Sequence, residues 1–256
     1  RKSDRKTVQR YICRPCERHF SVATLSACYR QKKRHLHSKV VQLLVGGVSQ
    51  REGAKILKVT RGTFIRKFLF TANAAQTKLR HFHTRFPKSQ IIEFDDMETF
   101  EHTKCKPIAI SIAVEQRSRR ILGYQVSKMR PKKKLSANLL SRYGERQDLR
   151  KKARAKLFSE LQPLVHPNCV IKSDQNPHYP PDVRKFFPHS KHKTYLSRRS
   201  CIVGQGELKS VTFDPLFSLN HTCAVLRART SRLIRKTWCT TKKMERLDLH
   251  LAPHTL

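Results

Sequence analysis

Residues 91–128 read IIEFDDMETFEHTKCKPIAISIAVEQRSRRILGYQVSK and contain three apolar segments separated by polar turns. The first segment, IIEFD, alternates apolar with acidic side chains, which is typical of a strand with one buried face. The second segment, residues 107–116, has branched side chains on one face and small ones on the other, and residues 119–128 follow after a short turn. This stretch therefore predicts a meander of three strands.

The sequence after this meander alternates helices with strands. A charged helical segment comes first, and residues 168–176 then form a short apolar strand. Residues 180–188 predict a short helix started by proline, and residues 189–196 predict a further strand. Apolar residues at helical spacing predict a final helix over residues 216–237. This order of elements predicts an α/β fold.

The charge of the chain limits the class of its partner. The 256 residues include 55 Lys and Arg against 18 Asp and Glu, which gives a formal charge of +37 and a pI near 10.7. Such a surplus disfavours a compact state, so we expect a polyanionic partner, with nucleic acid ahead of an anionic membrane. A basic surface without a specific partner is the alternative. At 38% apolar residues the chain can still bury a core.

Several features place the chain among reduced, non-membrane proteins. No run approaches the roughly 18–20 apolar residues of a membrane span, and no signal peptide opens the sequence. Eight scattered cysteines do not have the spacing of a disulfide framework, so we expect a cytosolic setting. The first residue is Arg1, and we expect the sequence to be a fragment of a longer chain.

Residues 35–70 show the pattern of three helices. The first carries a helical apolar face that ends at Gly46–Gly47, and Ser49 and Thr60 occupy the N-cap positions of the other two. Two short helices joined by a tight turn, with Arg and Thr on the second, are typical of a helix-turn-helix that enters the major groove. A small helical bundle with a solvated basic face is the alternative. The residues expected nearest to bases or phosphates are Arg61, Thr63, Arg66 and Lys67.

Cys13 and Cys16 form a CxxC motif within YICRPCERHF, residues 11–20. Its two-residue gap lets both thiolates bind one tetrahedral zinc ion, and Tyr11 and Phe20 flank it as the strands of a zinc ribbon often do. The motif supplies only two of four ligands, and we expect the other pair upstream. A pair of ordinary buried cysteines is the alternative.

Carboxylates are concentrated in residues 91–102, where five of twelve residues are acidic. Asp95 lies in the first strand of the meander and Asp174 in the fourth strand, with 78 residues between them. Neighbouring strands could bring them together, and two close carboxylates repel one another unless a cation lies between them. Mg²⁺ suits that place, because it prefers oxygen ligands and is usually held by one or two carboxylates plus substrate phosphates. A turn or cap role for each residue is the alternative.

Six segments of the chain resemble the transposases of bacterial insertion sequences, a family with a zinc ribbon, a helix-turn-helix and a ribonuclease-H-like DDE domain. The resemblance spans nearly the whole chain. The last two segments are the most specific, because helix-turn-helix patterns alone are common. The segments are RYICRPCERHFS, VSQREGAKILKVTRGTFIRKF, FDDMETFEHTKCKPIAISIAVE, SDQNPHYP, GQGELKSVTFDPLFSLNHTCAVLR and RLIRKTWCTTKK.

The resemblance implies a set of catalytic metal ligands. Asp95, followed by a second acidic residue, matches the first catalytic aspartate of the family, and Asp174 matches the second. The third ligand of the family lies on the final helix, seven residues before an arginine. Counting back from Arg227 gives Asn220 instead of glutamate, a pattern that some branches of the family resemble. An amide oxygen can bind magnesium without adding negative charge, and Glu207 is a rival third carboxylate.

The resemblance also implies the domains, cofactors and partners. We expect a partial zinc ribbon at residues 1–32, a helix-turn-helix region at 33–88, and at 89–256 a ribonuclease-H-like mixed sheet flanked by helices. The expected activity is strand cleavage and strand transfer at the ends of an insertion sequence, with Mg²⁺ or Mn²⁺ at the triad and Zn²⁺ at the CxxC motif. Double-stranded DNA is the expected partner, bound by a homo-oligomer at the nucleoid of the bacterial cytoplasm. The residues expected to bind phosphates along the last helix are Arg227, Arg232, Arg235 and Lys236.

A catalytically inactive, DNA-binding protein derived from a transposase is the alternative function. Three features favour it: the truncated start, the half-complete CxxC site, and a tail after Lys243 that departs from the family pattern. An RNA-binding protein lacks support, because the sequence contains no aromatic stacking motif.

Overall fold

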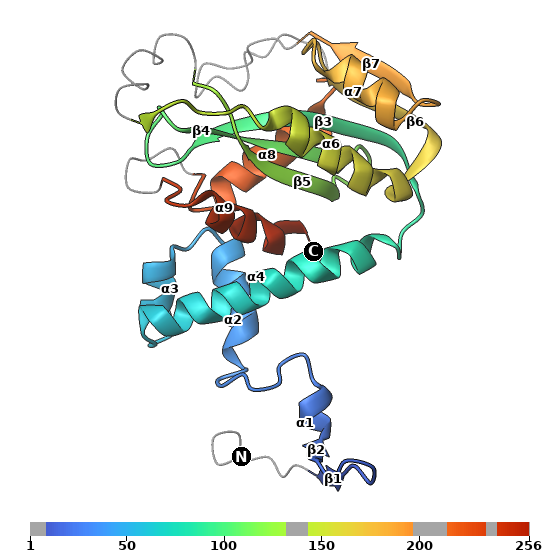
Figure 1. The fold of residues 1–256 in the computed structure, drawn as a ribbon. Helices are drawn as coiled ribbons and strands as arrows, with labels where there is room; N and C mark the ends of the chain where they lie inside the picture. The colour runs from blue at the N-terminus through green and yellow to red at the C-terminus, as the bar shows by residue number, and fades with distance from the viewer. Residues whose placement is uncertain (1–8, 132–142, 197–213, 234–239, 256) are drawn as a thin grey trace.

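A mixed sheet of five strands forms the centre of the fold in the computed structural model, which describes residues 9–131, 143–196, 214–233 and 240–255 (Figure 1). The strands are β3 (Ser89–Phe100), β4 (Pro107–Glu115), β5 (Ile121–Lys128), β6 (Val165–Asp174) and β7 (Lys191–Tyr195). Their order in the sheet is β5-β4-β3-β6-β7. The first three pair antiparallel, and β6 and β7 run parallel to β3.

This arrangement confirms the predicted fold class, a ribonuclease-H-like mixed sheet flanked by helices. The predicted meander is β3, β4 and β5. The pairing of β3 with β4 runs without a break from Ile92 opposite Glu115 to Phe100 opposite Pro107. β3 therefore occupies the middle of the sheet, with an antiparallel neighbour on one side and a parallel neighbour on the other.

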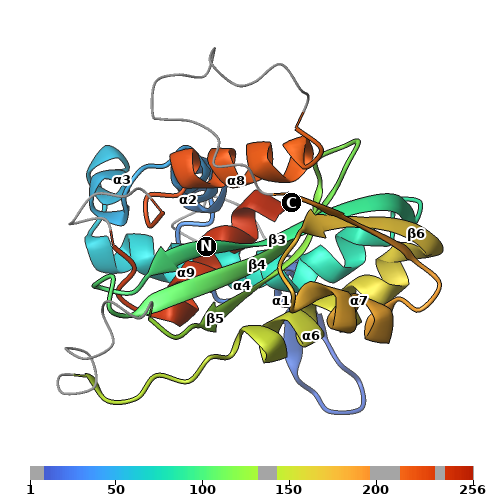
Figure 2. The same ribbon diagram turned by 90° about the horizontal axis from the view of Figure 1, so that it is seen from above.

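Helices cover both faces of the sheet (Figure 2). On one face lie α6 (Arg150–Leu161) and α7 (Tyr179–Phe186), and on the other lies α8 (Phe217–Arg229). The alternation along the strands decides which side chain meets which helix. Ile92 and Phe94 pack with α6 and α7, whereas the branched side chains of β4 pack with α8 and α9 (Met244–Leu251). Burial of these two apolar layers is the main favourable term in folding.

Three consecutive helices lead into the sheet: α2 (Leu36–Val45), α3 (Gln50–Ile56) and α4 (Arg61–His83). Both predicted caps are present, since Ser49 Oγ accepts a backbone N–H at 3.2 Å and Thr60 Oγ1 accepts one at 3.3 Å. A Cβ at Gly53 of α3 would come within 2.5 Å of the Phe64 ring of α4. The glycine therefore allows these two helices to pack closely.

A small antiparallel hairpin, β1 (Arg10–Ile12) and β2 (His19–Ser21), lies at the N-terminal end of the described chain and leads into α1 (Val22–Leu25). Tyr11 pairs with Phe20 across the hairpin, and their ring centroids are 5.4 Å apart. Both rings remain exposed, so the hairpin has no core of its own.

The C-terminal part of the chain differs from the prediction. α8 ends at Arg229, where Thr230 takes an extended backbone, and does not continue to residue 237. Helix α9 follows, although the sequence pattern did not predict it. Two short 3-10 helices, η2 (Gln162–Leu164) and η5 (Ala252–Thr255), follow α6 and α9.

Helix α9 joins the N-terminal helices to the sheet. The His250 ring packs on Phe68 of α4, with 4.4 Å between centroids. Asp248 accepts from Gln76 of α4 at 2.6 Å through its carboxylate, and from the Tyr124 hydroxyl of β5 at 2.9 Å through its backbone oxygen. The tail that departs from the family pattern is therefore part of the folded core.

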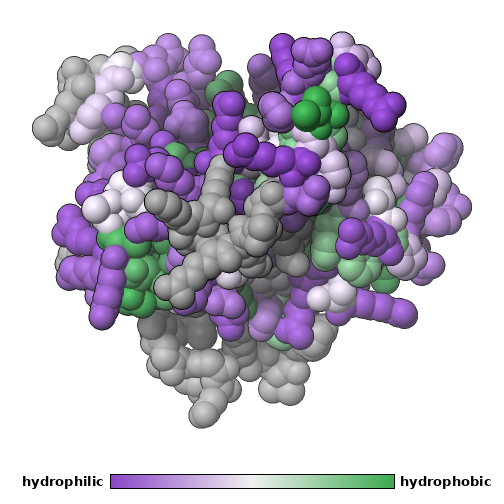
Figure 3. Space-filling view, turned by 90° about the horizontal axis from the view of Figure 1, so that it is seen from below, coloured by the Kyte–Doolittle hydropathy of each residue, from purple (hydrophilic) through white to green (hydrophobic). Residues whose placement is uncertain are grey.

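Hydrophilic side chains cover most of the face seen from below, with small hydrophobic patches between them (Figure 3). None of the described helices combines the length and the apolar character that a bilayer span requires. The longest of them, α4 with 23 residues, carries basic and polar side chains along its length.

Acid should destabilise the protein through histidines buried around α9. Burial lowers the pKa of His250 from 6.5 to about 3 and that of His254 to about 4, so both stay neutral in the folded chain. The unfolded chain takes up these protons first, so the contribution of these two histidines to the free energy of unfolding should fall as the pH drops from about 6.5 to about 4. His250→Leu should reduce this fall by roughly 3 kcal/mol in denaturant unfolding measured across pH.

The exposed His35→Leu is the matched control and should leave the pH dependence of unfolding unchanged. An equal pH dependence in the two variants would contradict the role of His250.

Candidate active site

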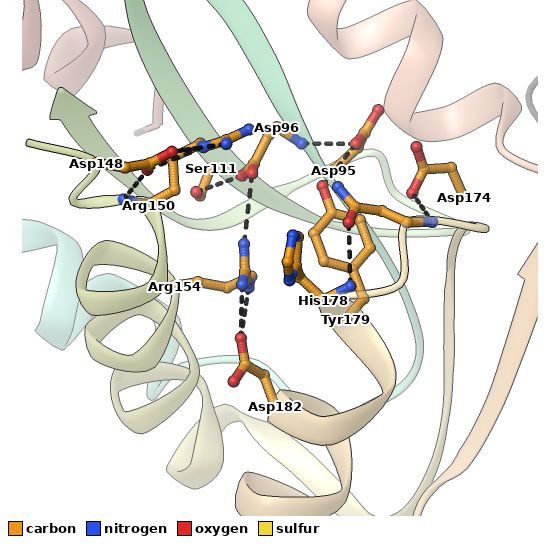
Figure 4. A network of polar contacts seen from close by, with 11 residues as sticks. Asp95, Asp96, Ser111, Asp148, Arg150, Arg154, Asp174, His178, Tyr179 and Asp182 are labelled. Atoms are coloured by element: carbon orange, nitrogen blue, oxygen red, sulfur yellow. Dashed lines mark hydrogen bonds and ion pairs between the residues drawn. The ribbon is translucent and has the colours of Figure 1, made fainter. Parts of the chain in front are cut away.

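The parallel pairing of β3 with β6 leads toward two aspartates, one on each strand. Glu93 pairs with Lys172, and two residues further along each strand come Asp95 and Asp174. Adjacent strands lie about 4.8 Å apart, and residues two apart on a strand point to the same face. Figure 4 shows Asp95 on β3 next to Asp174 at the end of β6. The structure therefore brings together the two aspartates singled out from the sequence.

Each of these carboxylates uses one oxygen within the protein. Asp95 Oδ1 accepts from the Tyr179 hydroxyl at 3.0 Å and from the Asp96 N–H at 2.7 Å. Asp174 Oδ1 accepts from the Asn176 N–H at 3.0 Å, in the turn that follows β6. No hydrogen-bond donor among the described residues reaches Oδ2 of either aspartate. One oxygen of each carboxylate is thus available to a cation.

Burial and repulsion make this pair unfavourable on its own. Loss of hydration, followed by the charge of Asp174, raises the pKa of Asp95 from 3.8 to about 6. A group that titrates this far from its ordinary value, beside a second carboxylate, is typical of a functional site. A cation between the two Oδ2 atoms would relieve the repulsion.

A buried glutamate attaches α8 to the sheet beside these aspartates. Glu93 lies two residues before Asp95 on the same face of β3 and is 1% exposed. Its Oε2 accepts from the Leu219 N–H, in the first turn of α8, at 2.9 Å. Burial raises the pKa of Glu93, an effect that this hydrogen bond partly counteracts. Because Asn220 follows directly in the helix, Glu93 fixes the turn that carries Asn220.

Asn220, the predicted third ligand, is exposed on α8. Its amide nitrogen donates to Asp214 Oδ2 at 2.8 Å, which leaves the amide oxygen as an acceptor. Glu207, the rival ligand, lies outside the described residues.

The available donors fit a hard divalent cation. Within the described ranges no three His, Cys, Asp or Glu side chains form a group that could hold a metal ion. Asp95 and Asp174 supply only two such side chains, and Asn220 is not one of these four residue types. Two carboxylates plus an amide oxygen, completed by water or phosphate oxygens, suit Mg²⁺ or Mn²⁺.

Asp96 follows Asp95 in the chain but points to the opposite face of the sheet and has its own partners (Figure 4). Its Oδ1 accepts from Ser111 Oγ at 2.5 Å, and its Oδ2 lies 3.5 Å from Arg154 Nη1. Arg154 is 4% exposed and also pairs with Asp182 of α7 at 2.7 Å. Asp96 therefore compensates a buried guanidinium.

Three residues around the site were not singled out from the sequence: Glu93, Arg154 and Tyr179. Arg154 belongs to the charged segment that the sequence predicted as helical, and the structure buries it between two carboxylates. Its spacing from Leu157 and Leu161 could have shown it, because residues three and seven apart share a helix face. Tyr179 lies within the segment SDQNPHYP but carried no role of its own.

The predicted DNA-binding residues differ in their surroundings. Arg61 and Arg66 are exposed on α4, and Thr63 between them takes part in the N-terminal cap. Arg227 is half-buried on α8, whereas Arg232 lies beyond the end of that helix. Two further predicted residues, Arg235 and Lys236, lie outside the described residues.

Lys67 does not share the exposure of its neighbours on α4. It is 5% exposed, and its ammonium group donates to Gln31 Oε1 at 3.2 Å and to the backbone carbonyl of Lys32. Its Nζ also lies 3.1 Å from His37 Nε2. Lys67 therefore joins α4 to the loop before α2, and we leave it out of the proposed phosphate contacts.

Cys13 and Cys16 lie in the turn between β1 and β2. A backbone hydrogen bond at Arg18, followed by a hydrogen bond with Cys13, lowers the pKa of Cys16. Cys28 Sγ lies 3.7 Å from His37 Nδ1 in a separate contact. The described residues do not join these two pairs into one group.

Comparison with known proteins gives little beyond the geometry. No protein-family model matches this chain, and no curated protein matches it. Among solved structures, the chain is similar to the crystal structure of the catalytic domain of Mos1 mariner transposase, at 13% identity and a TM-score of 0.26. The match covers 72% of this chain and 87% of that one. At this TM-score the likeness adds nothing to the fold assignment, which rests on the strand order.

The raised pKa of Asp95 predicts a stability that depends on pH. In metal-free protein the folded state binds the proton of Asp95 more tightly than the unfolded state, so the contribution of Asp95 to the free energy of unfolding should fall as pH rises from about 4 to about 6, opposite in sign to the contribution of the buried histidines. A rise of this size corresponds to at most about 3 kcal/mol. Asp95→Asn should therefore stabilise the protein at about pH 7 and have little effect at about pH 3.5, measured by denaturant unfolding in EDTA.

Asp148→Asn is a control of opposite sign. The Arg150 side chain donates to Asp148 and lowers its pKa, so this substitution should destabilise at neutral pH. If Asp95→Asn behaves like Asp148→Asn, the burial of the charged Asp95 is not the source of the effect.

Proposed function

We propose that this chain is a DNA transposase of an insertion sequence that carries out metal-dependent strand cleavage and strand transfer. The observation that carries this proposal is that the Asp95 and Asp174 side chains lie next to one another, each with an Oδ2 atom that no described donor reaches. The formal charge of +37 on the whole chain supports a polyanionic substrate.

In this proposal Asp95, Asp174 and Asn220 hold Mg²⁺ or Mn²⁺ through side-chain oxygens. When bound, the metal supplies Lewis-acid activation of the attacking oxygen and charge compensation at the leaving oxygen. Glu93 keeps the turn that carries Asn220 against the strand that carries Asp95. The carboxylates need a rigid frame, because the displacement at phosphorus requires the attacking and leaving oxygens in line.

The remaining parts of the chain would position DNA. Residues 33–88 would form a helix-turn-helix region, in which Arg61 and Arg66 of α4 contact bases or phosphates. Residues 89–256 would form the catalytic domain, with Arg227 on a phosphate. Residues 1–32 would contribute half of a zinc site, since a tetrahedral zinc needs two ligands beyond the thiolates of the hairpin.

Asp174→Ala should abolish Mg²⁺-dependent nicking of the cognate element ends. The loss should exceed about a hundredfold, because outer-shell partners of a metal alone contribute ten- to a hundredfold. Asp148→Ala, a carboxylate paired with Arg150 outside the site, should retain nicking. Specific DNA binding by the unchanged chain without any nicking would instead support the inactive, DNA-binding alternative.

DNA binding should weaken steeply with salt, because phosphate contacts release counterions. Replacing Arg61 and Arg66 together by glutamine should lower the slope of log affinity against log salt by about two if both contact phosphate. Lys88→Gln, an exposed charge at the start of the sheet, should change that slope less. A flat salt dependence of the unchanged chain would exclude the nucleic-acid partner.

A further inference from the structure

Tyr179, the first residue of α7, is fully buried directly beside Asp95. Its hydroxyl donates to Asp95 Oδ1 at 3.0 Å. A buried phenol requires a hydrogen-bond partner, and a carboxylate oxygen is the stronger kind of acceptor. Among the described residues, Tyr179 is the one side chain from another element that hydrogen-bonds to the Asp95 carboxylate.

Two contacts of the ring fix the position of this hydroxyl. The Tyr179 ring packs on Phe94, with 4.7 Å between centroids, and the Arg154 guanidinium lies over the ring at 5.0 Å. Arg154 is itself held by Asp182, three residues further along α7, at 2.7 Å. A rotation of the ring away from Asp95 would therefore lose its packing on Phe94 and its contact with the Arg154 guanidinium.

The same network separates the roles of the two adjacent aspartates. Asp96 has Ser111 on one oxygen and Arg154 on the other, so both of its oxygens face protein groups. Asp95 has its Oδ1 occupied and its Oδ2 free of described donors. Only one carboxylate of the Asp95–Asp96 pair can therefore offer an oxygen toward Asp174.

We infer that Tyr179 is the positioning residue of the site: its hydroxyl holds Oδ1 of Asp95, so that Oδ2 faces Asp174 and binds the divalent cation. This inference rests on the proposed function, since it assigns the cation to the same two aspartates. Arg154 completes the arrangement by holding Asp96 away from the cation. Tyr179 contacts neither DNA nor the reacting atoms and acts through the Asp95 carboxylate.

Tyr179→Phe in the full chain tests this directly, because it removes one oxygen and keeps the ring. Binding of Mn²⁺ without DNA, followed by the electron paramagnetic resonance signal of the free ion, should weaken by roughly tenfold, the typical effect of a hydrogen bond to a charged group. In strand cleavage kcat should fall while KM for the DNA ends stays unchanged. A merely structural residue would not produce this split between kcat and KM.

Tyr124→Phe is the matched control. Tyr124 is also a buried phenol, but its hydroxyl donates to the backbone oxygen of Asp248, on the α9 side of the sheet. This variant should keep the Mn²⁺ affinity and kcat of the unchanged chain. Equal Mn²⁺ affinities in Tyr179→Phe and Tyr124→Phe, with nicking retained in both, would overturn the inference and leave the proposed function standing.

Asp96→Asn provides a second test that does not depend on how well Tyr179→Phe folds. Because Asp96 faces Ser111 and Arg154, this variant should keep Mn²⁺ affinity within about twofold, whereas Asp95→Ala should lose it. If Asp96→Asn lowers the Mn²⁺ affinity as much as Asp95→Ala does, then Asp96 also binds the cation and the inference is overturned. If Asp95→Ala and the unchanged chain bind Mn²⁺ equally, the proposed metal site itself is wrong and the inference falls with it.

Discussion

The register between β3 and β6 is the constraint on which the proposed site depends. Side chains alternate along a strand, so a shift of one residue would turn Asp174 to the other face while Asp95 stayed in place. The long antiparallel pairing of β3 with β4 and the apolar layers on both faces hold β3 in this register. Two carboxylates that repel one another can be kept together here because the surrounding core outweighs their repulsion.

Four of the five carboxylates in the acidic segment 91–102 make different contacts in the structure. Glu93 binds the first turn of α8, Asp95 faces Asp174, and Asp96 compensates Arg154. Glu101, at the end of the segment, lies 3.7 Å from Arg146. A chain with so many cations concentrates its few acids where helices must be attached to the central strand and where a further cation would be bound.

Sequence patterns predicted the elements of the fold better than the polar contacts between them. The strand order of the meander, the caps at Ser49 and Thr60, and the placement of Asp95 and Asp174 at neighbouring strands followed from periodicity and chain order. The pairing of Arg154 with Asp96 and Asp182 did not, because a buried ion pair joins residues far apart in the chain and leaves no periodic signal. The early end of α8 was missed because apolar spacing continues past Arg229, although the backbone leaves the helix at Thr230. The burial of Lys67 was missed for the same reason, because it results from contacts with Gln31 and Lys32, which are more than 30 residues away in the chain.

Helix α9 contacts both the N-terminal helices and the sheet, so the loss of α9 would affect both. It packs on α4 through His250 and on β5 through Asp248, so the helices proposed to read DNA and the sheet proposed to cut it depend on the same short segment. A frameshift that removed only this segment would damage both regions at once.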